Sequence, residues 1–164
     1  MAKKQAGTPA MTALTRAGVA FETHTYAHDP RVSAHSGFGL EAAAALGVAP
    51  ERVFKTLIAS LDGRLVVGIV PVTAQLDLKA LARALGGAKA VMAEVAAAER
   101  STGYVAGGIS PLGQKRPLPT AIDETALAHP TIYVSGGRRG LDLELAPAEL
   151  VSVLGAVSAA ISRY

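Results

Sequence analysis

The chain has 164 residues, half of them hydrophobic, with 16 Lys and Arg, 13 Asp and Glu and no cysteine. This length suits one domain with a substantial core, so residues 1–164 are interpreted as a single domain. The missing cysteine excludes disulfides and a protein thiolate nucleophile. Without an apolar run of membrane-spanning length or a signal-peptide core, we expect a cytoplasmic protein with no membrane partner. The net charge of +3 permits an RNA or other phosphate-bearing partner without indicating one.

The first half of the chain predicts two short helices around a strand, followed by a hairpin. Residues 8–18 combine Thr and Pro at the start with a closing Gly, which is typical of a capped helix. Phe21–Tyr26, rich in Thr and aromatic residues, predicts a strand. A glycine-containing loop then leads to an Ala-rich helix over Leu40–Leu46. Two strands within Phe54–Val70 flank the turn dipeptide Asp62-Gly63, the clearest hairpin in the sequence.

The second half predicts alternating helices and strands. In chain order they are a helix over Asp77–Leu85, an Ala-rich helix before Gly103, strands near Thr120–Asp123, Thr131–Ser135 and Leu141–Leu145, and a last helix from about Pro147. Runs of antiparallel strand with single helices between them indicate an α/β fold of the α+β type. We expect a mixed, mostly antiparallel, barrel-like sheet with helices packed outside.

Two glycine-rich segments predict the walls of a pocket. In Ser101–Pro111 a glycine pair is bordered by hydroxyl residues, and backbone N–H groups there are open to a ligand's oxygens. No acidic residue occurs from Arg100 through Ile122. A second cluster, Ser135–Asp142, ends on a lone carboxylate. Together they indicate a pocket for a polar, anionic ligand.

Several common site types are excluded by spacing. A P-loop would need lysine where Gln114 stands, and Pro117 and Pro119 oppose the helix that should follow. The chain has no Gly-x-Gly-x-x-Gly after a strand and no Gly-x-Ser-x-Gly elbow. His24 and His28 lie across a strand end and a loop without a third ligand, so hydrogen-bonded histidines are favoured over a metal site. We expect no metal and no cofactor.

Lys55 is the most informative charge. It lies in an apolar strand, and alternation places it on the face of Leu57, Ala59 and Leu61. Either it is a strand-end lysine that reaches solvent, or it is a cation at a pocket floor with Asp142 as partner or neighbour. The alternation around Asp142 also fits a plain half-exposed strand.

Each of two further residue pairs has two possible interpretations. Tyr26 and Phe38 flank the glycine-containing loop, where they could form a lid or stacking platform or could anchor the loop to the core. Arg138 and Arg139 could contact phosphates or could be a solvated turn.

Six collinear blocks then carry a resemblance to a known family. They are His24-Thr-Tyr-Ala-His-Asp29, Val53-Phe-Lys-Thr-Leu57, Gln75-Leu-Asp-Leu-Lys79, Arg100-Ser-Thr-Gly-Tyr104, Gly107-Gly-Ile-Ser-Pro-Leu-Gly-Gln-Lys115 and Tyr133-Val-Ser-Gly-Gly-Arg-Arg-Gly-Leu-Asp142. The chain resembles the YbaK-type aminoacyl-tRNA deacylases, most closely the Cys-tRNA(Pro) deacylases. The likeness covers about residues 8–155, and it is weakest between Pro30 and Leu40, where the loop is longer than usual in the family.

The resemblance implies a metal-free pocket that removes cysteine wrongly attached to proline tRNA, and possible action on Cys-tRNA(Cys). It implies attack by the substrate's own thiol, which releases tRNA by cyclisation. On this basis the expected catalytic residues are Lys55, Gly107 and Asp142. The expected substrate-binding residues are Tyr26, Phe38, Thr56, Ser101, Thr102, Gly108, Ile109, Ser110 and Ser135. Lys115, Arg138 and Arg139 are expected to meet tRNA phosphates.

The expected partners are therefore aminoacyl-tRNA and, in a ternary complex, prolyl-tRNA synthetase; no DNA partner is expected. Two other functions stay open at this point. One is an Ala-tRNA(Pro) deacylase in which water attacks. The other is a non-catalytic module that binds charged tRNA or a synthetase.

Overall fold

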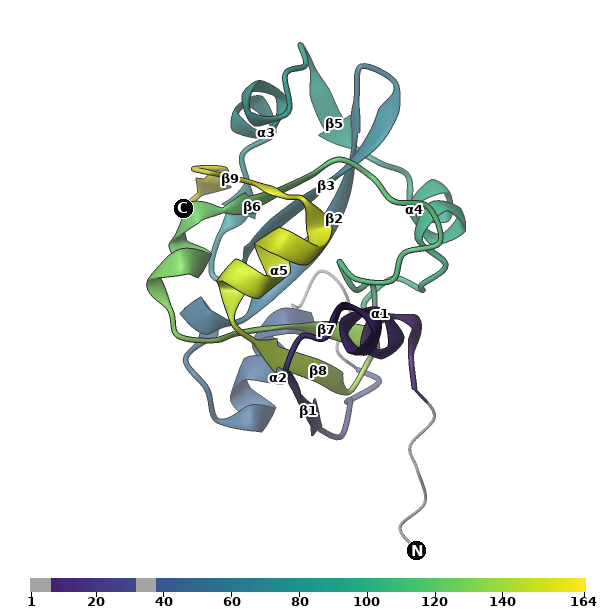
Figure 1. Ribbon diagram of the computed structural model, residues 1–164. Coiled ribbons are helices and arrows are strands. Elements are labelled where there is room, and N and C mark those ends of the chain that lie inside the picture. The colour runs from purple at the N-terminus through teal and green to yellow at the C-terminus, as the bar shows by residue number, and fades with distance from the viewer. Residues whose placement is uncertain (1–6, 32–37) are drawn as a thin grey trace, which may run out of the picture.

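The strands form three separate sheets (Figure 1). The computed structural model describes residues 7–31 and 38–164. The largest sheet contains, in spatial order, β5 (Ala90–Met92), β2 (Phe54–Leu61), β3 (Arg64–Pro71), β6 (Thr120–Asp123) and β9 (Val157–Ala159). A second sheet contains β1 (Glu22–Thr25), β8 (Leu141–Leu145) and β7 (Ile132–Arg138). The third pairs β10 (Ser162–Arg163) with β4 (Gln75–Leu76).

The pairing pattern confirms a mixed and mostly antiparallel fold. Only the β3–β6 and β6–β9 pairings are parallel; all others between the described strands are antiparallel. Among the described residues no sheet closes on itself, so the barrel-like part of the prediction is not confirmed. One isolated parallel bridge, between Val53 and Tyr133, links the start of β2 to β7 of the second sheet.

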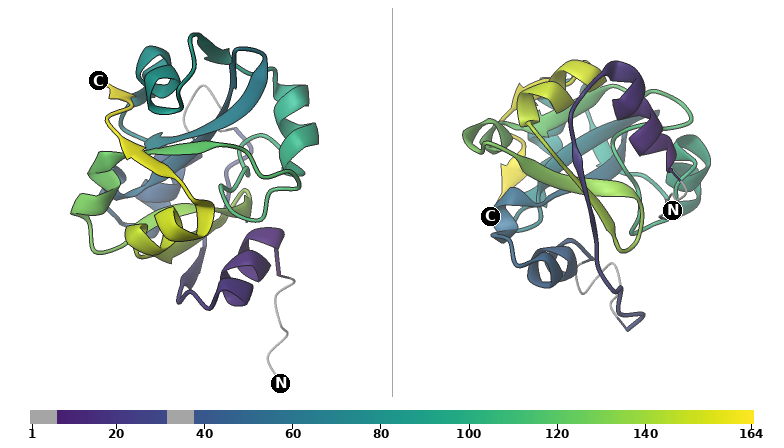
Figure 2. Two further views of the ribbon diagram at one scale, coloured as in Figure 1. Left: turned by 45° about the horizontal axis from the view of Figure 1, so that its top comes forward. Right: turned by 60° about the horizontal axis from the view of Figure 1, so that its bottom comes forward.

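The helices flank the sheets, as predicted (Figure 2). They are α1 (Pro9–Ala17), α2 (Phe38–Leu46), α3 (Leu78–Ala84), α4 (Val95–Thr102) and α5 (Pro147–Leu154), with 3₁₀ turns η1 (Pro50–Arg52) and η2 (Glu124–Ala128). The predicted caps of α1 are confirmed: the Thr8 side chain accepts from the Met11 N–H, and Gly18 is left-handed. None of the described helices is long and apolar enough to cross a membrane.

Two apolar layers hold the large sheet. One lies between the two larger sheets and includes Ile58, Ile69, Val134 and Leu143. The other lies on the opposite face, where Leu81 of α3 is fully buried with Ala59 and Ala121 among its cluster. Because side chains alternate along a strand, β2 supplies both layers, and this makes it the central element of the site.

Candidate functional site

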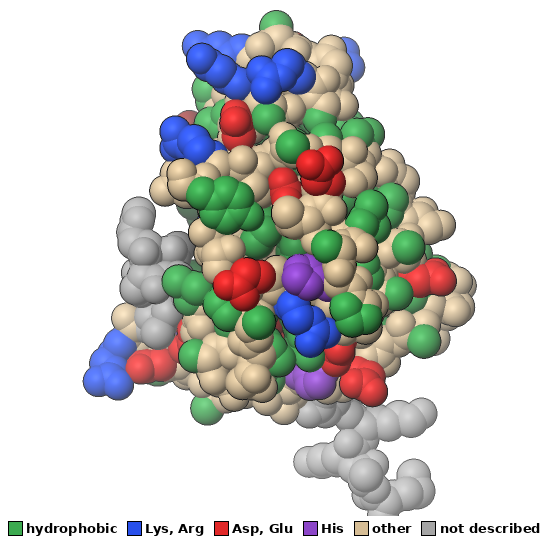
Figure 3. All heavy atoms as spheres, turned by 90° about the vertical axis from the view of Figure 1, so that its left-hand side faces the viewer, with side chains coloured by type: hydrophobic (Ala, Val, Ile, Leu, Met, Phe, Trp, Pro, Cys, Tyr) green, Lys and Arg blue, Asp and Glu red, His purple; other side chains and the backbone are tan. Residues whose placement is uncertain are grey.

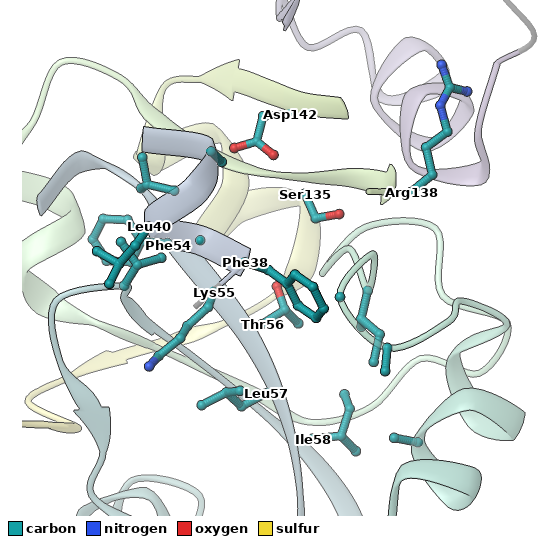
Figure 4. A pocket seen from close by; sticks show the side chains of 18 of the residues that line it. Phe38, Leu40, Phe54, Lys55, Thr56, Leu57, Ile58, Ser135, Arg138 and Asp142 are labelled. Atoms are coloured by element: carbon teal, nitrogen blue, oxygen red, sulfur yellow. The ribbon is translucent and has the colours of Figure 1, made fainter. Parts of the chain in front are cut away.

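A cavity of about 300 Å³ lies where β2, the start of α2, the β5–α4 segment and the loop after α4 come together. Its walls are mainly apolar, with a few polar side chains between them (Figure 4). Nine of the residues predicted for the site line it: Tyr26, Phe38, Lys55, Thr56, Gly107, Ile109, Ser135, Arg138 and Asp142. Segments far apart in sequence thus meet at one place.

β2 contributes an incompletely paired edge to this cavity. Its neighbour β5 pairs only with Ala59–Leu61, and the Ala93 N–H donates to the Ile58 carbonyl at 3.1 Å. Backbone groups of every second residue point to the same edge of an antiparallel strand, so those of Thr56 share the edge used by Ile58. No described strand pairs with β2 there. Thr56 lines the cavity, so the cavity borders backbone groups that the described strands leave unpaired.

Lys55 lies at the end of one face of β2. Leu57, Ala59 and Leu61 belong to the apolar layer on that face, so the predicted alternation is confirmed. The lysine is half-buried, and burial lowers its pKa. Among the described residues it forms no ion pair. Lys55 is therefore a partly desolvated cation available to a ligand.

Asp142 is a nearly buried carboxyl on the second sheet. It lies on β8 between His24 of β1 and Ser135 of β7, and it is only 5% exposed. Burial raises its pKa to about 7, against a smaller lowering effect of His24. The pKa of Tyr26 is raised to about 12, mainly by burial and secondly by Asp142. Asp142 can thus exchange its proton near neutral pH.

Two hydroxyl residues in the cavity differ in how they are bonded. The Oγ1 of Thr56 is buried and has no hydrogen-bond partner among the described residues. Such an atom is costly in an empty cavity and is satisfied if a ligand occupies it. Ser135 instead accepts a bond from the Gly137 N–H at 3.2 Å, beside an irregularity in the β7–β8 register. Thr56 is therefore the better candidate for a direct polar contact.

Gly107 occupies a position that only glycine suits. Its φ is +84°, and an added Cβ would lie 2.6 Å from Phe38 Cε2 and 2.7 Å from Arg139 Nε. Its N–H has no acceptor among the described residues. The Gly108 N–H, by contrast, donates to the Val105 carbonyl at 2.9 Å. The expectation that both glycines offer free N–H groups is therefore corrected for Gly108; of the two, Gly107 alone lacks an acceptor within the described part of the chain.

Three predicted hydroxyl residues, Ser101, Thr102 and Ser110, are buried but do not line the cavity. Thr102 Oγ1 donates to the Ala98 carbonyl at 2.8 Å, which is a bond within α4. Ser110 Oγ accepts from the Leu112 N–H at 3.2 Å. Gly108 likewise does not line the cavity. These residues shape the segment that carries Gly107.

The three residues predicted to contact phosphates, Lys115, Arg138 and Arg139, lie in different surroundings. Lys115 is exposed and lies outside the cavity lining, whereas Arg138 lines it. Figure 4 shows the Arg138 side chain extending away from Ser135 and Asp142, toward α1. Arg139 is bonded to the Ala106 carbonyl. Most of the long Pro30–Leu40 loop, residues 32–37, lies outside the described residues.

A second group of cations was not singled out from the sequence. Figure 3 shows Lys and Arg side chains gathered at the end of the molecule that carries α3 and the β2–β3 turn. Exposed cations in and next to these segments are Arg64 of β3, Lys79 and Arg83 of α3, and Lys89 of the loop between α3 and β5. They come from three parts of the chain, and only the fold brings them to one end.

The two histidines form separate hydrogen bonds, as predicted. His24 Nε2 lies 2.9 Å from Glu144 Oε1, and His28 Nδ1 lies 2.7 Å from Glu41 Oε1. Glu22 joins His24 and Glu144 in a cluster whose ligand-type atoms lie within 4.8 Å of one another. Arg52 lies 3.5 Å from Glu144, so one carboxylate of this cluster already has a cationic partner.

Comparisons with known proteins agree with this geometry. Residues 40–153 match the family model described as an aminoacyl-tRNA editing domain. A protein of Enterococcus faecalis (strain ATCC 700802 / V583), named "Putative Cys-tRNA(Pro)/Cys-tRNA(Cys) deacylase EbsC", is 38% identical over 158 residues, 93% of each chain.

Two solved structures also match over nearly their whole length, each at 25% identity and a TM-score of 0.83. One, "Crystal structure of a putative trans-editing enzyme for prolyl tRNA synthetase", aligns over 98% of this chain and all of its own. The other, "Crystal structure of hypothetical protein APE2540", aligns over 95% of this chain and all of its own. The resemblance found in the sequence is confirmed, and the chain belongs to the aminoacyl-tRNA editing domain family.

Proposed function

We propose that this protein is a trans-editing deacylase that removes cysteine from Cys-tRNA(Pro), and also from Cys-tRNA(Cys). The observation that carries this proposal is the meeting of Lys55, Gly107 and Asp142 at one small, mainly apolar cavity. The name of the 38% identical relative supports the choice of amino acid. The name of the first of the two solved structures, which includes prolyl tRNA synthetase, supports proline tRNA as the carrier.

The need for such an enzyme follows from the limits of molecular recognition. Proline and cysteine are similar in size, and a pocket that separates small apolar groups achieves only about 10- to 200-fold discrimination. A second site that cleaves the wrong product supplies the remainder. The cavity of about 300 Å³ with apolar walls is suited to a small side chain.

The proposed chemistry uses the nucleophile of the substrate. The cysteinyl sulfur attacks its own ester carbonyl, a C–S bond forms, and the C–O bond to the terminal ribose breaks. The thiol proton goes to the departing ribose oxygen, and a thiolactone is released from the tRNA. Intramolecular attack can reach effective molarities of about 10⁵–10⁸ M when the geometry is enforced.

The protein then has to orient the ester and stabilise charge. In our proposal the Gly107 N–H donates to the ester carbonyl oxygen as negative charge develops there. Lys55 holds an oxygen of the terminal adenosine or of the ester, and ionised Asp142 binds the α-ammonium group. The Thr56 hydroxyl gains from the substrate the hydrogen-bond partner that the described residues do not provide. Tyr26, Phe38, Ile109 and Ser135 complete the walls.

The rest of the tRNA would lie outside the cavity. We assign Lys115 and Arg138 to acceptor-stem phosphates, because both are exposed. Prolyl-tRNA synthetase, acting in a ternary complex, would supply recognition of the tRNA body. Binding through phosphates weakens with salt, so raising the salt concentration should raise KM more than it lowers kcat.

One panel of substrates tests the proposal and both alternatives. We expect release of cysteine from Cys-tRNA(Pro) and Cys-tRNA(Cys), and little release from Ala-tRNA(Pro) or Ser-tRNA(Pro), which lack a thiol. Preferential release of alanine would replace the proposal by an Ala-tRNA(Pro) deacylase in which water attacks. Salt-sensitive binding without any release over a long incubation would indicate a non-catalytic binding module.

A further inference from the structure

Three segments at the mouth of the cavity are tied together by one side chain, Arg139. Its Nε and one Nη donate to the Ala106 carbonyl at 3.1 and 2.6 Å. Its guanidinium lies over the Phe38 ring, 4.8 Å from the centroid. The Phe38 ring in turn contacts His28, with centroids 5.6 Å apart. The turn after β7, the start of α2 and the loop after α4 thus meet at this arginine.

The carbonyl that Arg139 binds belongs to the same peptide group as the Gly107 N–H. This peptide bond is trans, since none of the bonds in the described chain is cis. In a trans peptide the C=O and N–H point in opposite directions in one plane. A side chain that fixes the Ala106 carbonyl therefore also fixes the direction of the Gly107 N–H.

The bond has an electronic consequence as well. Hydrogen bonds from a guanidinium are charge-assisted and stronger than neutral ones. A donor on the carbonyl side polarises the peptide group, so its N–H becomes a better donor on the other side. The absence of a Cβ at Gly107 allows Phe38 and Arg139 to pack directly against this backbone.

From this geometry we infer that Arg139 is a positioning residue, which holds the Ala106–Gly107 peptide so that the Gly107 N–H faces the reacting ester. The inference rests on the proposed function. It replaces the expectation that Arg139 meets a tRNA phosphate, because the guanidinium is already bonded through two nitrogens and packed on an aromatic face. Arg138, which has no such contact among the described residues, keeps the phosphate assignment.

The test uses two substrates, Cys-tRNA(Pro) and 3′-O-cysteinyl-adenosine, of which the second lacks acceptor-stem phosphates. Single-turnover rates are measured at saturating enzyme for wild type, Arg139→Ala and Arg139→Lys. We expect Arg139→Ala to lower the rate roughly 10- to 100-fold on both substrates. This loss is below the 10²–10³-fold effect of deleting an oxyanion donor, because the N–H itself remains. Arg139→Lys should recover part of the rate, since it restores one charged donor.

Arg163→Ala is the matched control, because Arg163 is an exposed arginine outside the cavity lining and its loss removes the same charge. Its rates should equal those of wild type. A loss in Arg139→Ala that occurs only with the full tRNA would overturn the inference in favour of a phosphate contact. Equal rates of Arg139→Ala and wild type on both substrates would overturn it too.

A measurement without substrate separates this inference from the proposed function. If wild type releases no cysteine, the proposed function fails, but the contact can still be followed by NMR. The Ala106 carbonyl-carbon and Gly107 amide-nitrogen resonances should move in Arg139→Ala, move less in Arg139→Lys and stay in place in Arg163→Ala. Unchanged resonances in Arg139→Ala would show that Arg139 does not hold this peptide.

Discussion

Asp142 and Lys55 line the same cavity, yet they do not form an ion pair with each other (Figure 4). Asp142 comes from β8 of the second sheet, whereas Lys55 comes from β2 of the large sheet, and Figure 4 shows its Nζ directed away from the carboxyl. Burial therefore shifts the pKa of each group toward its neutral form, and neither group offsets the shift of the other. Of the two relationships that the sequence left open, Asp142 is a neighbour of Lys55 in the cavity and not its ion-pair partner. Each group therefore stays available for the substrate contact that we propose for it.

Replacing Lys55 should lower the deacylation rate without lowering the stability of the protein. In Lys55→Met we expect a loss of single-turnover deacylation of at least about 10²-fold, as for other charged groups aimed at a reacting centre. The free energy of unfolding should stay the same or rise, because a half-buried ammonium is replaced by an apolar chain of similar length. Quenched-flow assays and thermal unfolding measure the two effects. If a folded Lys55→Met protein kept the deacylation rate of wild type, Lys55 would not have the catalytic role that we propose.

Replacing Thr56 should also change activity and stability in opposite directions, because its buried hydroxyl has no hydrogen-bond partner among the described residues. Thr56→Val removes a buried oxygen without a partner, so the free energy of unfolding should rise by up to about 1 kcal/mol. If the hydroxyl binds substrate, kcat/KM should fall about tenfold. Thr56→Ser keeps the oxygen and is the matched control, which should retain most of kcat/KM. Equal activity of the Val and Ser variants would show that the hydroxyl does not contact substrate.

Local sequence signals predicted the elements that depend on local conformation. The turn Asp62-Gly63 is an example, because both residues adopt positive φ, at +51° and +85°, as the hairpin requires. The short strands β4, β5, β9 and β10 were missed. Each has two or three residues, and their pairing partners are distant in sequence, so no periodic pattern marks them.

For the site, too, local sequence signals predict some features, whereas features that depend on distant residues cannot be predicted. Lys55 was found because a charge interrupts an apolar strand, which is a local signal. The engagement of the Gly108 N–H by Val105 depends on the shape of a turn that composition does not determine. The bond from Arg139 to Ala106 joins residues 33 apart in sequence, so only the tertiary structure reveals it. The sequence identified the segments, and the fold decided which of their atoms face the cavity.

Asp142 should make stability depend on pH. Its pKa is raised from 3.8 to about 7 in the folded protein, so between these values the folded state holds a proton that the unfolded state has lost. Stability therefore falls as pH rises through this window. The cost above pH 7 is about 4 kcal/mol, since each pKa unit is worth about 1.4 kcal/mol. Asp142→Asn cannot ionise and escapes this cost.

The measurement compares thermal unfolding of wild type and Asp142→Asn from pH 4 to 8. We expect little difference near pH 4 and a growing advantage of Asp142→Asn toward pH 7, after which it levels off. Using the difference between the two proteins cancels other titrating groups. An advantage that is equally large at pH 4 would show that the carboxyl does not titrate in this window.

The same ionisation should appear in catalysis. If ionised Asp142 binds the α-ammonium group, kcat/KM of the free enzyme should rise with pH and inflect near 7. Asp142→Asn should lose activity and also lose this inflection, although the protein is more stable at that pH. Initial rates at low substrate concentration over pH 5.5–8.5, roughly centred on that pKa, measure the profile. An unchanged inflection in Asp142→Asn would assign it to another group, such as the amine of the substrate.

Gly107→Ala tests whether the backbone at this position must stay open. The substitution places a methyl group 2.6 Å from Phe38 Cε2 and forces a non-glycine residue to φ +84°. The left-handed conformation alone costs about 1–2 kcal/mol. Gly18→Ala is the matched control, because Gly18 has φ +71° with nothing within 4 Å and lies outside the cavity lining. Both variants should lose similar stability from backbone strain, with an added loss in Gly107→Ala from the clash.

Only Gly107→Ala should lose deacylation, because the added methyl group displaces Phe38 and Arg139, which pack against the peptide group whose N–H is assigned to the ester oxygen. We expect its single-turnover rate to fall by roughly 10²-fold, the effect of losing an oxyanion donor, while Gly18→Ala keeps the rate of wild type. Both are assayed well below their unfolding temperatures, so that loss of folded protein does not enter the rate. A folded Gly107→Ala protein with the rate of wild type would remove the Gly107 N–H from the proposed mechanism and, with it, the catalytic consequence of the Arg139 contact.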